Sequence, residues 1–185
     1  MLRIAIRQTE GSALVEFAVV LPLLVVFLVG IYDFSGAFNQ KQKIGHAAQE
    51  GAVIAGAQPM MDIYATNPSP ASLRPVVAVV FNSLVQNGVL PQGNQGSCIL
   101  PGSATYVSGL KWQFSITGCP DTLLVTIDRG LVTGTAGQTQ ALTTSVTVSY
   151  KYHWRFNSVI QLLFPGAAYS PTTDLSDAAT TQNQS

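Results

Sequence analysis

The feature that most constrains the fold of this chain is an apolar run close to its start. From Phe17 to Tyr32 the sequence FAVVLPLLVVFLVGIY carries no charged side chain, and Ala13–Val15 extend the run backwards past Glu16. An α-helix needs about 20 apolar residues to cross the hydrocarbon core of a bilayer. The run therefore predicts a transmembrane helix over residues 12–32, with the lipid bilayer as its surroundings.

Composition supports an anchored protein and argues against a nucleic-acid-binding one. Nine Lys and Arg residues balance nine Asp and Glu residues, so the chain has no net charge with which to hold phosphates. Charged residues make up only 10% of the chain, against roughly 25% in soluble domains. With 185 residues, the chain has room for one domain of ordinary size besides the anchor.

The cations that flank the apolar run predict its orientation. Arg3 and Arg7 precede the run, whereas Lys41 and Lys43 follow it at a greater distance. Positive residues favour the cytoplasmic side, so we expect a single-pass inner-membrane protein with a cytoplasmic N-terminus and a periplasmic or extracellular C-terminal part. A removed secretory signal peptide is the alternative, although residues 33–36 (DFSG) offer no small-x-small cleavage site directly after the run.

Glu16 is unusual because a carboxylate inside a membrane helix costs about 2 to 3 kcal/mol, less near the interface. It stands in the string Gly11-Ser12-Ala13-Leu14-Val15-Glu16-Phe17, which precedes a Leu/Val run that contains Pro22. This string resembles the processing motif of type IV prepilins. In particular, it is similar to that of TadE-like minor pseudopilins of tight-adherence (Flp) pilus systems.

The resemblance implies that a prepilin peptidase cleaves between Gly11 and Ser12, so that residues 1–11 are a leader. Cleavage would place the α-amine of Ser12 one helical turn from Glu16 on the same face. We expect this carboxylate, followed by the aromatic Phe17, to set the register of the helix against an adjacent pilin or pseudopilin. The alternative is a solvated Glu16 at the level of the lipid headgroups. The implied partners are other pilins, the prepilin peptidase and the inner-membrane assembly platform, with incorporation into a pilus.

The helical pattern continues beyond the membrane as far as Gln58, where Pro59 prevents continuation. Residues 33–58 would then form a protruding continuation of the helix. The segment Gly45–Gly56 is rich in Gly and Ala, which permit close approach of another backbone. Packing on the chain's own sheet and packing on a neighbouring subunit both fit this composition.

Residues 59–166 are expected to form an exported domain of class α+β. A loop over Met60–Pro70 precedes a second helix that opens at Ser69-Pro70 or Arg74-Pro75 and stops at Gly88. A surface loop is predicted over Pro91–Gly109, and a short last helix over Ser158–Phe164. The tail, residues 167–185, lacks an apolar period and is predicted to be disordered.

A period of two predicts three antiparallel strands between these helices. Their apolar positions are Leu110, Trp112, Phe114 and Ile116; Leu123, Val125 and Ile127; and Val146, Val148, Tyr150, Tyr152, Trp154 and Phe156. Such a meander buries one face, which the protruding helix and the second helix would cover. The predicted fold is therefore a long N-terminal helix packed on a three-stranded antiparallel sheet, a pilin-like arrangement.

Cys98 and Cys119 are the only two cysteines, and in an exported domain they predict one disulfide; two free thiols are the alternative. The two histidines, His46 and His153, stand in no catalytic or metal-binding spacing. We therefore expect no enzymatic activity, cofactor or metal. The other functions that fit are a signal-anchored periplasmic binding or adhesion domain and a pseudopilin of a type II-like secretion system.

Overall fold

The computed structural model describes residues 8–91, 98–100, 103–134, 140–156, 166 and 170–184. The chain divides into two compact units, which are treated separately below. One unit combines Met1–Gly36 with Trp154–Pro171, and the other combines Ala37–His153 with Thr172–Ser185. The helix predicted for Ser158–Phe164 lies outside the described residues.

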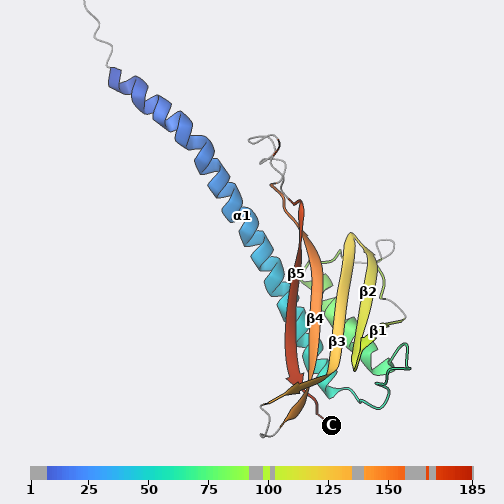
Figure 1. Ribbon diagram of the computed structural model, residues 1–185. Coiled ribbons are helices and arrows are strands. Elements are labelled where there is room, and N and C mark those ends of the chain that lie inside the picture. Colours follow the sequence, from blue (N-terminus) through green and yellow to red (C-terminus); the bar gives the residue numbers. More distant parts are fainter. Residues whose placement is uncertain are drawn as a thin grey trace, which may run out of the picture. The chain divides into compact units, whose positions relative to one another are not determined.

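A single helix, α1, spans Gln8–Ala57 and includes Pro22 (Figure 1). It begins four residues before Ser12 and ends one residue before Gln58, next to the proline that blocks its continuation. Beyond the apolar run, Phe34 and Phe38 remain 67% and 56% exposed. They therefore do not belong to the packed face of the helix.

The described residues of the second unit form five antiparallel strands rather than the three predicted, and these strands lie side by side in sequence order (Figure 1). The α+β class is confirmed and the strand count is corrected. The strands are β1 (Thr105–Ser108), β2 (Lys111–Cys119), β3 (Asp121–Thr133), β4 (Ala141–His153) and β5 (Thr172–Gln182).

Both additional strands lie in segments that were expected to be irregular. β1 falls within the predicted loop Pro91–Gly109, and β5 falls within the tail that was predicted to be disordered. β5 pairs with β4 in unbroken register from Thr143↔Gln182 to His153↔Thr172. Backbone hydrogen bonds to an existing strand therefore order a segment that contributes few apolar side chains of its own.

The three predicted strands have the expected alternation. Trp112, Phe114 and Ile116 are buried on β2, and the apolar positions of β3 and of β4 up to Tyr152 are buried as well. β4 ends at His153, so Trp154 and Phe156 do not belong to the strand, and they fall in the other unit. The alternation therefore locates the sheet core but extends β4 too far.

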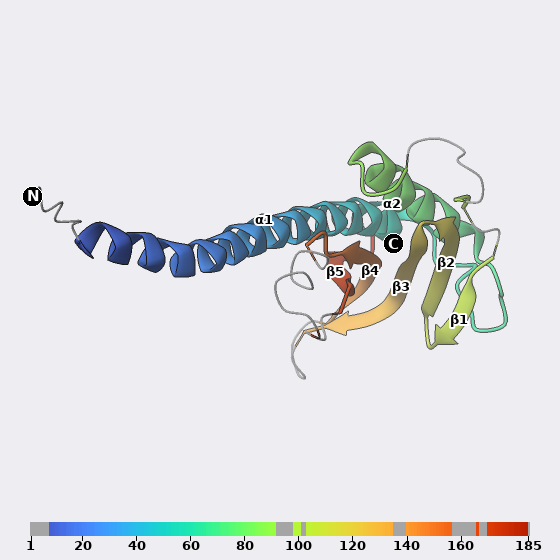
Figure 2. The same ribbon diagram turned by 90° about the horizontal axis from the view of Figure 1, so that it is seen from above.

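One face of the sheet is covered by the later part of α1 and by α2 (Arg74–Gln86), as Figure 2 shows. A single turn of 3-10 helix, Ala71–Leu73, precedes α2. Pro75 lies in the first turn of α2, where a proline is well tolerated. The small residues of α1 form its contact surface: Ala47, Ala48, Ala52 and Ala55 are buried. The Gly/Ala-rich segment thus packs within its own domain.

Arg129 of β3 is a fully buried cation that contacts the residues directly after α1. Its Nη2 donates to the Gln58 carbonyl at 2.9 Å, its Nη1 to the Pro59 carbonyl at 3.2 Å, and its Nε to Thr144 Oγ1 at 3.2 Å. Burial lowers the pKa of Arg129 from its ordinary value, while the negative charge of Asp62 opposes that shift. Arg129, which lies on β3, therefore places a positive charge at the C-terminus of α1. Such a charge stabilises a helix C-terminus, and the last turn of α1 has no basic side chain of its own.

Cys98 and Cys119 form the expected disulfide. It joins the end of β2 to the segment ahead of β1, across a sequence separation of 21 residues. Closing a loop of this length contributes about 3 kcal/mol by restricting the unfolded chain.

Candidate functional site: the exposed part of the long helix

The first unit contains the apolar part of α1, and its large side chains are exposed along the whole run. Leu14, Phe17, Leu23 and Phe27 are each about 60 to 70% exposed, and the most apolar window of the helix has no buried share. A helix of this length and composition exposes so much apolar surface only where lipid or another protein covers it. It therefore fits a membrane anchor.

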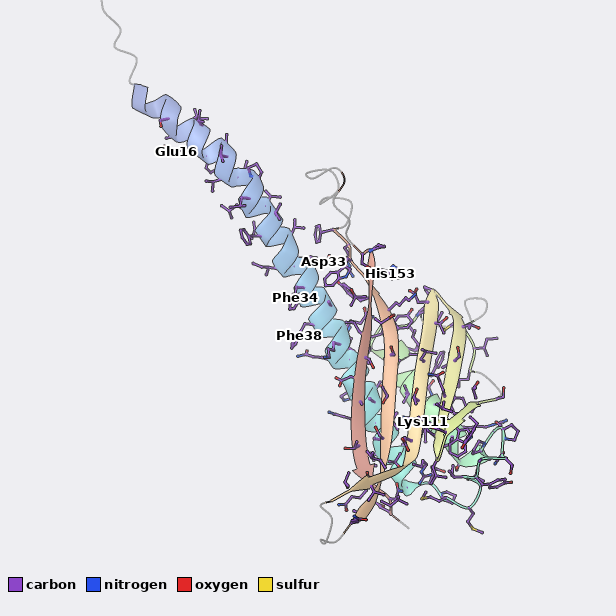
Figure 3. All side chains as sticks on the ribbon, in the orientation of Figure 1. Glu16, Asp33, Phe34, Phe38, Lys111 and His153 are labelled. Atoms are coloured by element: carbon purple, nitrogen blue, oxygen red, sulfur yellow. A yellow bond between two sulfur atoms is a disulfide. The ribbon has the colours of Figure 1, made fainter. Side chains whose placement is uncertain are left out.

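The predicted processing and register residues lie together in the first turns of this exposed helix. Ser12 Oγ donates to Glu16 Oε1 at 3.2 Å, which shows that the two positions share one face. A Cβ added at Gly11 would meet no atom of another described part of the chain within 4 Å. Figure 3 labels Glu16 on this part of α1.

Asp33 follows the apolar run directly and is only 4% exposed. The backbone N–H groups of Arg155 and Phe156 donate to its Oδ1 and Oδ2, both at 3.3 Å. The rings of Tyr32 and Phe156 meet edge to face at 5.9 Å between centroids. The sequence patterns did not predict this arrangement, although Asp33 is an acid at the end of an apolar run with no cation one helical turn away.

The remaining candidate residues do not join a common site. His46 lies 3.6 Å from Glu50 on α1, whereas His153 pairs with Asp121 at the end of β4. Within the described ranges, no group of three His, Cys, Asp or Glu side chains could share a metal ion. An open groove of 610 Å³ lies between α1 and α2, and its lining includes His46, Glu50, Val53, Val79 and Asn82.

These features define a class of protein that combines an N-terminal apolar helix that fits a membrane anchor with an α+β domain. The family described as TadE-like protein matches residues 11–53 of this chain. This stretch begins at Gly11 and contains the apolar run and much of the Gly/Ala-rich segment. The match agrees with the resemblance drawn from the Gly11–Phe17 string. Neither the curated proteins nor the solved structures include a match to this chain.

Proposed function

We propose that this chain is a minor pseudopilin, a structural and assembly subunit of a tight-adherence type IV pilus. The observation that carries this proposal is the spacing of Gly11, Glu16 and Phe17 at the head of an exposed apolar helix, inside the stretch that matches the TadE-like family. The match supports involvement in a tight-adherence system. The pseudopilin role rests on the chemistry of the helix start.

In this proposal, prepilin peptidase cleaves the bond between Gly11 and Ser12 and leaves the apolar helix in the mature subunit. The new α-amine of Ser12 is then a cation within one turn of Glu16, where the Ser12 hydroxyl already reaches the carboxylate. An ion pair with this amine, or with that of a neighbouring subunit, would lower the free-energy cost of moving the Glu16 carboxylate into lipid. The helix inserts into the pilus or its inner-membrane platform, and the α+β domain lies outside the cytoplasm without catalytic chemistry.

Processing is the direct test of this proposal. Protein recovered from membranes of cells that hold the complete pilus system should begin at Ser12. Gly11→Val should abolish cleavage and leave the leader in place, because the motif that this string resembles has a glycine directly before the cut. Edman sequencing and intact mass measure both outcomes.

Gly30→Val is the matched control, since Gly11 and Gly30 are both α1 glycines with no atom within 4 Å of an added Cβ. This variant should be cleaved normally. A mature protein that keeps residues 1–11 would favour the signal-anchored binding domain, for which the groove beside His46 is the candidate ligand site. Loss of the apolar stretch would indicate a removed signal peptide and contradict the proposal.

Glu16→Gln should be processed normally and yet enter pili poorly, because the amide offers no charge to the Ser12 amine. We expect about a tenfold loss in the sheared pilus fraction, the equivalent of one lost charge pair of about 1.4 kcal/mol. Immunoblotting of sheared and membrane fractions measures this. Glu50→Gln is the control, because Glu50 lies on the same helix and pairs with His46. Normal incorporation of Glu16→Gln would place this residue, solvated, among the headgroups.

A further inference from the structure

The bonds of Asp33 fix two residues of a distant segment at one level of the membrane helix. Asp33 accepts from the backbone of Arg155 and Phe156, which are more than 120 positions away in sequence. The stretch from Ser12 to Tyr32 rises about 32 Å at 1.5 Å per residue, close to the thickness of a hydrocarbon core. Asp33 therefore stands where hydrocarbon gives way to headgroups, and the segment after β4 meets the helix at that depth.

The side chains gathered at this level are those that membrane interfaces favour. Tyr32 is 61% exposed and touches the ring of Phe156, Trp154 is half-buried, and Arg155 is exposed. Trp and Tyr concentrate at headgroup depth, where one end of the ring is apolar and the other end is polar. An Arg guanidinium binds phosphate through paired N–H groups. Both carboxylate oxygens of Asp33 accept hydrogen bonds from the backbone of this chain.

We propose that Trp154–Phe156 form a second membrane contact, which lies in the phospholipid headgroup layer beside the transmembrane helix and is held there by Asp33. Lipid is the occupant because this surface adjoins the outer end of the exposed apolar helix, where Tyr32 contacts Phe156. The contact rests on the anchoring part of the proposed function. The contact does not depend on removal of the leader. An experiment can therefore contradict the contact without contradicting the proposed pilus function.

The two tryptophans of the chain make this contact measurable. Trp112 is fully buried in the other unit, whereas Trp154 is half-buried at the proposed interface. The full chain is reconstituted in phosphatidylcholine and phosphatidylglycerol vesicles whose acyl chains are brominated either close to the headgroup or close to the bilayer centre. The emission difference between the wild type and Trp154→Phe isolates Trp154 without any change to the core.

Shallow bromines should remove most of the Trp154 emission, and deep bromines should remove much less. The Trp154→Phe protein, which retains Trp112, should be quenched by neither. Asp33→Ala should float with vesicles as the wild type does, because the apolar helix is intact, yet its Trp154 should lose most of the shallow quenching.

Three results would overturn the proposal. The first is that neither the shallow nor the deep brominated lipid quenches Trp154 emission in vesicle-bound protein. The second is quenching that declines as the protein-to-lipid ratio rises, which would show that a neighbouring chain covers the segment instead. The third is unchanged quenching in Asp33→Ala, which would show that Asp33 does not hold the segment at the interface.

Discussion

Replacing Arg129 with methionine should lower the free energy of unfolding by about 3 to 5 kcal/mol. Methionine keeps most of the apolar volume but leaves the Gln58 and Pro59 carbonyls and the Thr144 hydroxyl without the donors that Arg129 supplies. Each orphaned buried acceptor costs about 1 to 3 kcal/mol, and removal of the desolvated charge offsets part of that cost. Denaturant unfolding in detergent micelles measures the loss, followed by the fluorescence of Trp112 in a Trp154→Phe background.

Arg129→Lys should fall between the wild type and Arg129→Met. A lysine ammonium carries the charge but lacks the planar fork that reaches several acceptors at once. Lys151→Thr is the matched control, because this cation is exposed on β4 and its removal should change stability by no more than about 0.5 kcal/mol. If Arg129→Met unfolds at the wild-type denaturant concentration, Arg129 does not stabilise the end of α1.

The second large effect is expected at Gly51, where α1 packs tightly against Val80 of α2 and Val146 of β4. An added Cβ would lie 2.5 Å from Val80 Cγ2 and 3.3 Å from Val146 Cγ1. Gly51→Leu should therefore lower the free energy of unfolding by about 3 kcal/mol, since overpacking a tight core forces backbone shifts. The same unfolding experiment measures this loss. Gly30→Leu, on the same helix with open space around it, should leave unfolding of the sheet domain unchanged.

A double-mutant cycle separates this clash from a general intolerance of the helix. Gly51→Ala alone should destabilise despite the gain of about 1 kcal/mol in helix propensity. Val80→Ala alone leaves a cavity. The double variant should lose less than the sum of the two single losses, because the new methyl group fills the space that the valine vacates. Strict additivity would contradict direct contact between these two positions.

Sequence patterns predicted those parts of the fold in which apolar side chains are periodic. The charge-free run and the Gly/Ala-rich segment predicted α1, and alternation predicted the buried positions of β2, β3 and most of β4. β1 and β5 were missed because register with an existing neighbour, rather than their own apolar side chains, orders them. In β5 only Leu175 and Ala179 pack against the core, and the remaining residues read as a polar tail.

The candidate site shows the same division. Gly11, Ser12, Glu16 and Phe17 could be identified because their spacing is local. Arg129 continues the inward series of Leu123, Val125 and Ile127, so its position in the pattern was visible, but its carbonyl partners come from 70 residues away. Asp33 was visible as an isolated acid, whereas its bonds to Arg155 and Phe156 depend on tertiary structure that one sequence does not encode locally.

The place of β5 has a consequence for how the domain forms during synthesis. The strand follows β4 in the chain, and Gln184 N–H donates to the Gly56 carbonyl at 2.9 Å, near the end of α1. α1 is synthesised first, but the Gly56 carbonyl in its last turn can accept this hydrogen bond only after Gln184 has been added to the chain. Until then the nascent domain exposes the unpaired backbone of β4, which is open to strand addition by other chains. A chaperone that shields this edge should reduce aggregation most when translation pauses before Thr172.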